Sequence, residues 1–168
     1  MVKKLRKNKR GSIEDIIWIF ITLFAISVII LIVFKVSNEL NTQFQSSSSV
    51  NTRGKSAYSS INNMFPGVLD NSFLLLTVGL GIMALIFAMM VRIHPVFFVF
   101  FVIILAIILF VSGAFSNVYQ EMANNPDLAD VAAQLTFIDN IMTYLPFIIG
   151  IFGFLLAIVM YKNWQQNV

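Results

Sequence analysis

Four long runs of apolar residues, none interrupted by a charged side chain, constrain this chain more than any other feature of its sequence. They are Ile16–Phe34, Phe73–Val91, Pro95–Phe115 and Ile141–Tyr161. A helix needs about 20 mostly apolar residues to cross the roughly 30 Å hydrocarbon core of a bilayer, and each run has about that length. Lipid offers no partners to backbone N–H and C=O groups, so each run must satisfy them internally as a helix. The sequence therefore predicts an all-α integral membrane protein with four transmembrane helices.

The composition supports this fold class and excludes several others. The chain has 168 residues, of which 58% are hydrophobic and 11% are charged, whereas soluble domains are about 45–50% apolar and about 25% charged. A soluble fold of this size could not bury so much apolar surface. The chain has no cysteine, which excludes a disulfide framework, a zinc-thiolate site and a thiol nucleophile.

The runs divide the chain into tails, spans and polar segments. The predicted organisation is a basic tail (1–15), a first span (16–36), an outer polar segment (37–71), a second span (73–91), an inner turn (92–95), a third span (95–115), an outer acidic segment (116–140), a fourth span (141–161) and an inner C-terminal tail (162–168). Pro95 disfavours helical geometry at His94 and suits the first turn of a new helix. We therefore expect the second and third spans to form a tight helical hairpin rather than one long helix.

The distribution of charge predicts the orientation in the membrane. With both termini inside, every Lys and Arg except Lys35, Arg53 and Lys55 lies on the cytoplasmic side, as the positive-inside rule requires. The acidic residues divide the other way, because only Glu14 and Asp15 then lie inside. Aromatic anchors are expected at the inner boundary (Trp18 and Trp164) and at the outer boundary (Tyr144).

The first outer segment contains two apolar patterns of helical spacing. Val36, Leu40 and Phe44 continue the stripe of the first span, so that span is expected to project beyond the bilayer. Tyr58, Ile61 and Phe65 then predict a short amphipathic helix, which Pro66-Gly67 should end. We expect this short helix to lie on the membrane surface or to dock on a partner.

The second outer segment should form one amphipathic helix that leads into the fourth span. Asn125-Pro126-Asp127 is typical of a helix start, with an asparagine cap, a proline in the first turn and an acid beside it. The expected apolar face is Leu128, Val131, Ala132, Leu135 and Ile138, and the polar side carries Asp127, Asp130 and Gln134. Because the segment has no Lys or Arg, it suits its own bundle or a protein partner better than anionic lipid.

Two stripes of small residues are candidates for helix packing. Thr77, Gly81, Ala84 and Ala88 lie on the second span, and Pro146, Gly150, Gly153 and Ala157 lie on the fourth, both at spacings of 4, 3 and 4. Small residues let membrane helices approach closely. The stripes are expected to seat neighbouring helices within the subunit or between subunits, unless they only reflect how common Gly and Ala are in membrane spans.

The basic tail is a candidate for binding anionic groups. It carries Lys3, Lys4, Arg6, Lys7, Lys9 and Arg10. These side chains could hold anionic lipid headgroups or the phosphates of a nucleic acid against the inner face. The alternative is a topology signal that binds nothing.

Groups that could carry chemistry are missing from the spans. None of the four runs contains Asp, Glu, Lys, Arg or His, whereas transporters and ion pathways usually place such groups there. The single histidine, His94, cannot build a multi-histidine metal site. We therefore expect no enzymatic activity, no metal and no cofactor.

The sequence favours a structural or assembly role in a membrane complex. The expected partners are the lipid bilayer and other membrane or coat proteins, in a homo- or hetero-oligomer. The layout of basic head, apolar spans and short polar loops resembles small multi-pass membrane proteins of membrane-containing viruses. That resemblance implies a virion internal membrane and a basic tail that faces the packaged genome; a cell inner membrane is the other location expected. The alternative function is a holin-like pore or a secretion-channel subunit.

Overall fold

The computed structural model describes residues 13–90 and 95–165, and every element in these ranges is a helix. The helices are α1 (Ile13–Ser46), α2 (Thr52–Met90), α3 (Pro95–Ala123), α4 (Ala129–Ala132), α5 (Thr136–Thr143) and α6 (Leu145–Gln165). Four of them, α1, α2, α3 and α6, are long and apolar enough to cross a membrane. The predicted all-α fold with four transmembrane helices is confirmed, and the orientation stays a prediction.

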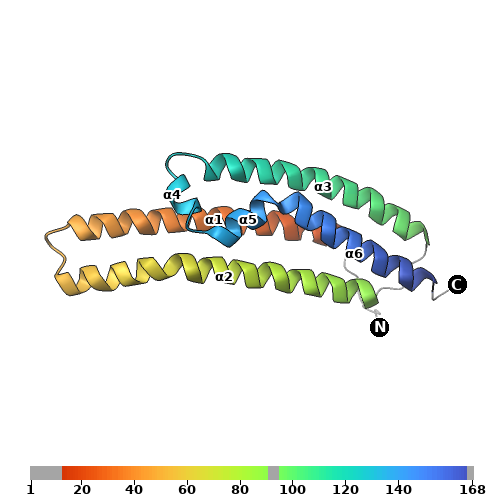
Figure 1. Ribbon diagram of the computed structural model, residues 1–168, viewed down its shortest axis with the longest axis horizontal. Helices are drawn as coiled ribbons and strands as arrows, with labels where there is room; N and C mark the ends of the chain where they lie inside the picture. The colour runs from red at the N-terminus through yellow and green to blue at the C-terminus, as the bar shows by residue number, and fades with distance from the viewer. Residues whose placement is uncertain (1–12, 91–94, 166–168) are drawn as a thin grey trace, which may run out of the picture.

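The four long helices run side by side in a bundle (Figure 1). α1 packs against α2, and α3 packs most extensively against α6. The first turn of α1 and the last turn of α6 lie at the same end of the bundle (Figure 1). The short helices α4 and α5 contact α1 and α3, and α5 also contacts α2. α3 begins at Pro95 as expected, while Arg92 and His94 lie outside the described residues.

α1 and α2 are much longer than a bilayer core requires. α1 has 34 residues and α2 has 39, so at 1.5 Å per residue they measure about 51 Å and 59 Å, against a core of about 30 Å. Their connected ends extend past α4 and α5 as an antiparallel hairpin (Figure 1). The helix of the first span is continuous to Ser46, and its projection beyond the bilayer stays a prediction.

Contacts at the tip hold this hairpin together. The Asn51 side chain caps α2 by accepting a hydrogen bond from the Gly54 N–H at 2.7 Å. Lys55 and Gln45 exchange side-chain to backbone hydrogen bonds of 2.7 and 3.0 Å. The rings of Phe44 and Tyr58 lie 4.8 Å apart. The first outer segment is therefore mostly paired helix, with only residues 47–51 connecting α1 and α2.

The expectation that Pro66-Gly67 ends a short helix is wrong, because α2 continues through Pro66. Proline removes one backbone hydrogen bond and disfavours a helix locally. Long-range contacts on either side outweigh this preference: Asn62 bonds to α1 and Asp70 bonds to α5. Tertiary packing overrides local propensity here.

The expectation of one amphipathic helix after Asn125 is wrong in detail, because the structure divides it into α4 and α5. Asn125 caps a turn rather than a helix: its side chain accepts a hydrogen bond from the Asp127 N–H at 2.9 Å, and α4 begins only at Ala129, without a side-chain cap. The chain then breaks at 133–135 and starts a second helix. The predicted apolar face is nevertheless buried, since Val131, Leu135 and Ile138 are each fully enclosed.

Burial is concentrated where α4 and α5 meet the long helices. The enclosed side chains there are Leu31, Phe34, Phe73, Tyr119, Val131, Leu135, Ile138 and Met142. By contrast, at most 28% of the most apolar window of any candidate span is buried. The best-packed part of the protein therefore lies at one end of the spans, and the spans leave most of their apolar surface to lipid or to neighbouring helices.

Candidate functional site

The most specific polar contact in the structure joins α2 to the start of α5. The carboxylate of Asp70 accepts hydrogen bonds from the backbone N–H groups of Phe137 and Ile138, each at 2.8 Å. Leu135, which precedes α5, supplies no side-chain cap. Asp70 thus acts as the N-terminal cap of a helix 67 residues away in sequence. A carboxylate at this position satisfies orphan donors and interacts favourably with the helix dipole.

This cap also explains why the chain breaks between α4 and α5. The first N–H groups of a helix lack intrahelical partners. Asp70 is buried, with 7% of its surface exposed, and offers both carboxylate oxygens to these groups. A new helix can therefore start at Thr136, with Thr136 and Phe137 at the surface and Ile138 buried.

The other end of α5 is held by α3. The Ser116 hydroxyl donates a hydrogen bond to the Thr143 carbonyl at 2.8 Å. The Gln120 amide in turn donates to the Ser116 hydroxyl oxygen at 3.2 Å. Orphan carbonyls at the end of a helix need such partners. Both ends of α5 are therefore satisfied by side chains from other helices.

Two groups beside Asp70 are less well satisfied. Tyr119 is fully buried, and within the described part of the chain its hydroxyl has no hydrogen-bond partner. The carboxylates of Asp139 and Asp70 are close enough to act on this hydroxyl electrostatically. Burial raises the pKa of the Asp139 carboxyl above its ordinary value. The charged form of Asp139 is therefore disfavoured in the folded protein.

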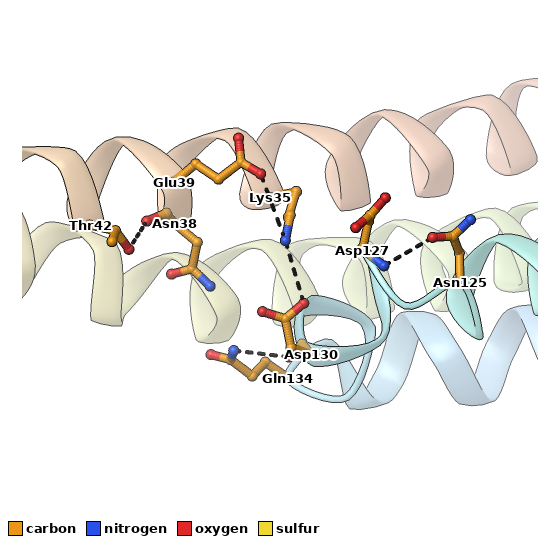
Figure 2. Close-up of polar contacts among 8 residues, drawn as sticks. All are labelled: Lys35, Asn38, Glu39, Thr42, Asn125, Asp127, Asp130 and Gln134. Carbon is orange, nitrogen blue, oxygen red and sulfur yellow. Dashed lines mark hydrogen bonds and ion pairs between the residues drawn. The ribbon is translucent and has the colours of Figure 1, made fainter.

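Lys35 links α1 to the turn of α4. Figure 2 shows its ammonium group between Glu39 and Asp130, and the N–O distances are 3.7 and 3.8 Å. The Lys35 side chain is 24% exposed, whereas both acids are mostly exposed. Ion pairs of this kind contribute about 0–1 kcal/mol each. They add a modest link between α1 and α4 beside the stronger cap at Asp70.

A fourth polar contact joins the two helices of the hairpin. The Ser37 hydroxyl donates a hydrogen bond to the Asn62 amide oxygen at 2.8 Å, and the Asn62 amide nitrogen donates to the Asn38 amide oxygen at 2.7 Å. Ser37 and Asn62 are both buried. We call Lys35, Ser37, Asn62, Asp70, Ser116 and Asp130 the polar collar, because they connect helices around the α4–α5 level.

Three of the glycines in the two predicted small-residue stripes lie against side chains of neighbouring helices. A Cβ atom at Gly81 would lie 2.9 Å from the ring of Phe152, so Gly81 makes room for an α6 side chain. A Cβ atom at Gly153 would overlap the Leu105 side chain of α3, and one at Gly150 would lie 3.6 Å from Leu109. These three glycines admit large side chains of neighbouring helices.

The remaining predicted packing residues have other surroundings. The Thr77 hydroxyl donates to the Phe73 carbonyl within its own helix at 2.9 Å. Ala84 is exposed, and Pro146 and Ala157 are half-buried. The side chain of Ala88 lies outside the described part of the structure. Whether these residues also seat a second subunit stays a prediction.

The predicted anchors and the basic tail are only partly described. Trp18 and Tyr144 are both exposed on the bundle surface. The side chain of Trp164 is not among those described. Lys3, Lys4, Arg6, Lys7, Lys9 and Arg10 also lie outside the described residues.

A shallow apolar groove of about 470 Å³ runs along the outer face of α6. Its lining is Pro146, Phe147, Gly150, Ile151, Phe154 and Leu155. All of these residues come from one helix, so the groove is a feature of the surface that faces lipid in the predicted span. Nothing in its lining is charged, and it offers no polar group that would orient a substrate.

Sequence reasoning missed the polar collar. The sequence predicts Asp70 only as one of the outer acids and Lys35 only as one of three outer basic residues. The one available signal was position: Asp70 directly precedes an apolar run, where a lone carboxylate needs a partner as it nears the bilayer. The partner itself could not be inferred, because it is a pair of backbone groups 67 and 68 residues away.

The polar collar joins helices of the bundle to one another. Within residues 13–90 and 95–165, no three His, Cys, Asp or Glu side chains gather as they would around a metal ion. The collar carboxylate of Asp70 is fully engaged by backbone N–H groups. Searches of known protein families, characterised proteins and solved structures found no match to this chain.

Proposed function

We propose that this protein is a structural component of a membrane-embedded complex, a multi-pass scaffold that packs in several copies or beside partner membrane and coat proteins. The observation that carries the proposal is the use of the buried polar side chains. Asp70, Asn62 and Ser116 each connect two different helices. In an enzyme or a transporter, buried polar groups would bind the substrate. Here they connect the helices of the bundle.

The exposed apolar surface also supports an assembly role. The α2 and α3 windows are each only 11% buried within one copy. Glycines on α2 and α6 show that these helices accept close packing where a neighbour is present. The bundle is tightly packed at the end where α4 and α5 lie, but its spans expose most of their apolar surface. This suits a protein whose spans are covered by lipid and by neighbouring proteins.

A pore or secretion conduit is the second function to test, and the packing of one copy disfavours it. A water-filled path needs polar lining, yet the rings of Phe24 and Phe115 stack between α1 and α3 at 4.8 Å. The buried hydroxyls of Ser27 and Ser112 bond to carbonyls of their own helices. A conduit would therefore have to form between copies.

The second part of the proposal is that the basic tail binds anionic groups. In a virion internal membrane or a cell inner membrane, Lys3 to Arg10 would lie against anionic headgroups or the phosphates of a packaged genome. Each such residue near an anionic surface contributes about 1 kcal/mol. Replacing the six Lys and Arg residues by Gln should abolish salt-dependent retention of nucleic acid by the full-length protein. Equal retention by the neutralised tail would remove the nucleic-acid role.

The scaffold proposal is tested by extracting the protein from its own membrane with a lipid-preserving polymer and identifying what accompanies it. We expect stoichiometric recovery of further copies or of defined membrane partners, and electrical silence in planar bilayers. Recovery of isolated single chains would contradict the scaffold. Discrete conductance steps would favour the pore instead.

A further inference from the structure

One face of α2 has no partner among the described residues of the bundle. Ile61, Met64 and Val68 are 55%, 69% and 61% exposed. At 100° per residue, this face lies about 160° from the face that buries Asn62, Asp70 and Phe73. The side of α2 that faces α1 and α5 is thus buried in the bundle, and the opposite side is exposed.

The same face continues along the helix in a heptad pattern. Its positions are Ile61, Met64, Val68, Asn71, Leu75, Val78 and Ile82, at alternating spacings of 3 and 4, and all seven are exposed. We call these seven residues the α2 seam. Any exposed helix face has a spacing close to this, so the pattern alone does not identify a partner.

The height of the seam limits what can cover it. The predicted second span, residues 73–91, measures about 28 Å at 1.5 Å per residue, which matches the hydrocarbon core. With this span in the core, Val68, Met64 and Ile61 lie about 8, 14 and 18 Å beyond it. Lipid tails cover Leu75 to Ile82 but cannot cover the upper three residues, and a soluble partner could reach only the upper three.

One kind of partner covers the seam along its full length: a membrane helix that extends beyond the core at the same height. α2 of a second copy is such a helix. Insertion into one membrane gives every copy the same direction and depth, so identical seam positions meet each other in a parallel pair. Charge does not oppose this pairing, because the only charged residue from Ser56 to Met90 is Asp70, which is directed at α5.

Asn71 adds a feature that favours self-association. It lies in the middle of the seam and is exposed. An amide side chain can both donate and accept a hydrogen bond, so two copies of Asn71 are complementary to each other. A single Asn in an otherwise apolar seam fixes the register of parallel coiled coils.

We propose that the α2 seam pairs with the same seam of a second copy in a parallel, two-fold arrangement. This inference rests on the proposed scaffold function and names one of its contacts as self-association through α2. It assigns the upper seam residues a buried position in the assembled protein.

Single-cysteine crosslinking of the full-length protein in its membrane tests the seam, since the chain has no cysteine of its own. Met64→Cys and Val68→Cys place a thiol on the seam, and Asn63→Cys places one at the same height on an exposed position off the seam. A disulfide needs Cβ atoms about 3.5–4.5 Å apart. Mild oxidation should therefore give several-fold more covalent dimer for the two seam variants than for Asn63→Cys.

Two results would overturn the seam: no dimer from either seam variant, or as much dimer from Asn63→Cys as from them. The mass of the unmodified particle extracted with its lipid separates this failure from failure of the scaffold. A multi-copy particle without seam crosslinks rejects the α2 contact alone. A particle with one chain and no partner rejects the scaffold as well.

Discussion

Replacing Asp70 should release α5 while leaving the four spans intact. The carboxylate accepts two hydrogen bonds of 2.8 Å from Phe137 and Ile138 in a buried position. Hydrogen bonds to charged groups contribute about 1.5–3 kcal/mol each, and leaving a buried donor unsatisfied costs about 1–3 kcal/mol. We therefore expect Asp70→Ala to destabilise the docking of α5 by about 3–5 kcal/mol, as for other broken buried polar contacts.

The isosteric change Asp70→Asn refines this expectation. The amide keeps one acceptor oxygen, so it should lose one of the two bonds and the interaction of the charge with the helix dipole. The expected loss is about 1.5–3 kcal/mol. We expect α5 docking to be least stable with Ala at position 70, more stable with Asn and most stable with Asp. This order separates the cap from a general effect of charge.

Hydrogen exchange of the full-length protein in lipid measures this directly. Exchange at the Phe137 and Ile138 amides reports local opening of α5, and about 2 kcal/mol corresponds to roughly 30-fold faster exchange. Asp127→Asn is the matched control, because it removes one carboxylate charge from an exposed position in the segment that contains α5. Unchanged exchange in Asp70→Ala, or equal acceleration in Asp127→Asn, would refute the cap.

Three further changes test the interior. Tyr119→Phe removes a buried hydroxyl without a partner among the described residues, so the free energy of unfolding in detergent should rise by about 1–2 kcal/mol; a comparable loss would show that the hydroxyl is bonded. Asp139→Asn should raise thermal stability at pH 7, because the raised pKa means that the folded state disfavours the carboxylate. This gain should shrink as the pH falls toward about 4 and protonates the wild-type group; a gain independent of pH would contradict the assignment. Gly153→Leu should cost about 1–3 kcal/mol by overpacking against Leu105, whereas Gly113→Leu, which meets open space, should change thermal unfolding little; equal effects would contradict the close contact.

The four spans could be predicted from the sequence because the bilayer imposes one requirement on each. An apolar run of sufficient length must be a helix whatever it packs against. The local geometry of Pro95 was enough to predict that the second and third spans are two helices and not one, and α3 begins at this residue. The buried face of Val131, Leu135 and Ile138 was also predictable, since its spacing did not depend on which helices cover it.

The errors arose where long-range contacts decide the outcome. Pro66 ends helices by its local chemistry, but α2 continues because Asn62 and Asp70 are held by other helices. The break between α4 and α5 has the same origin, because the cap at Asp70 comes from a distant helix. Neither contact leaves a periodic pattern in the sequence, so the polar collar could be found only in three dimensions.

The mass of the particle extracted from its native membrane with surrounding lipid tests the scaffold most directly. The account predicts a defined particle well above the 18.9 kDa of one chain, containing several copies or stoichiometric partners, and a mass that does not fall when the particle is diluted. A particle that contains one chain and lipid, with no second protein, would contradict it.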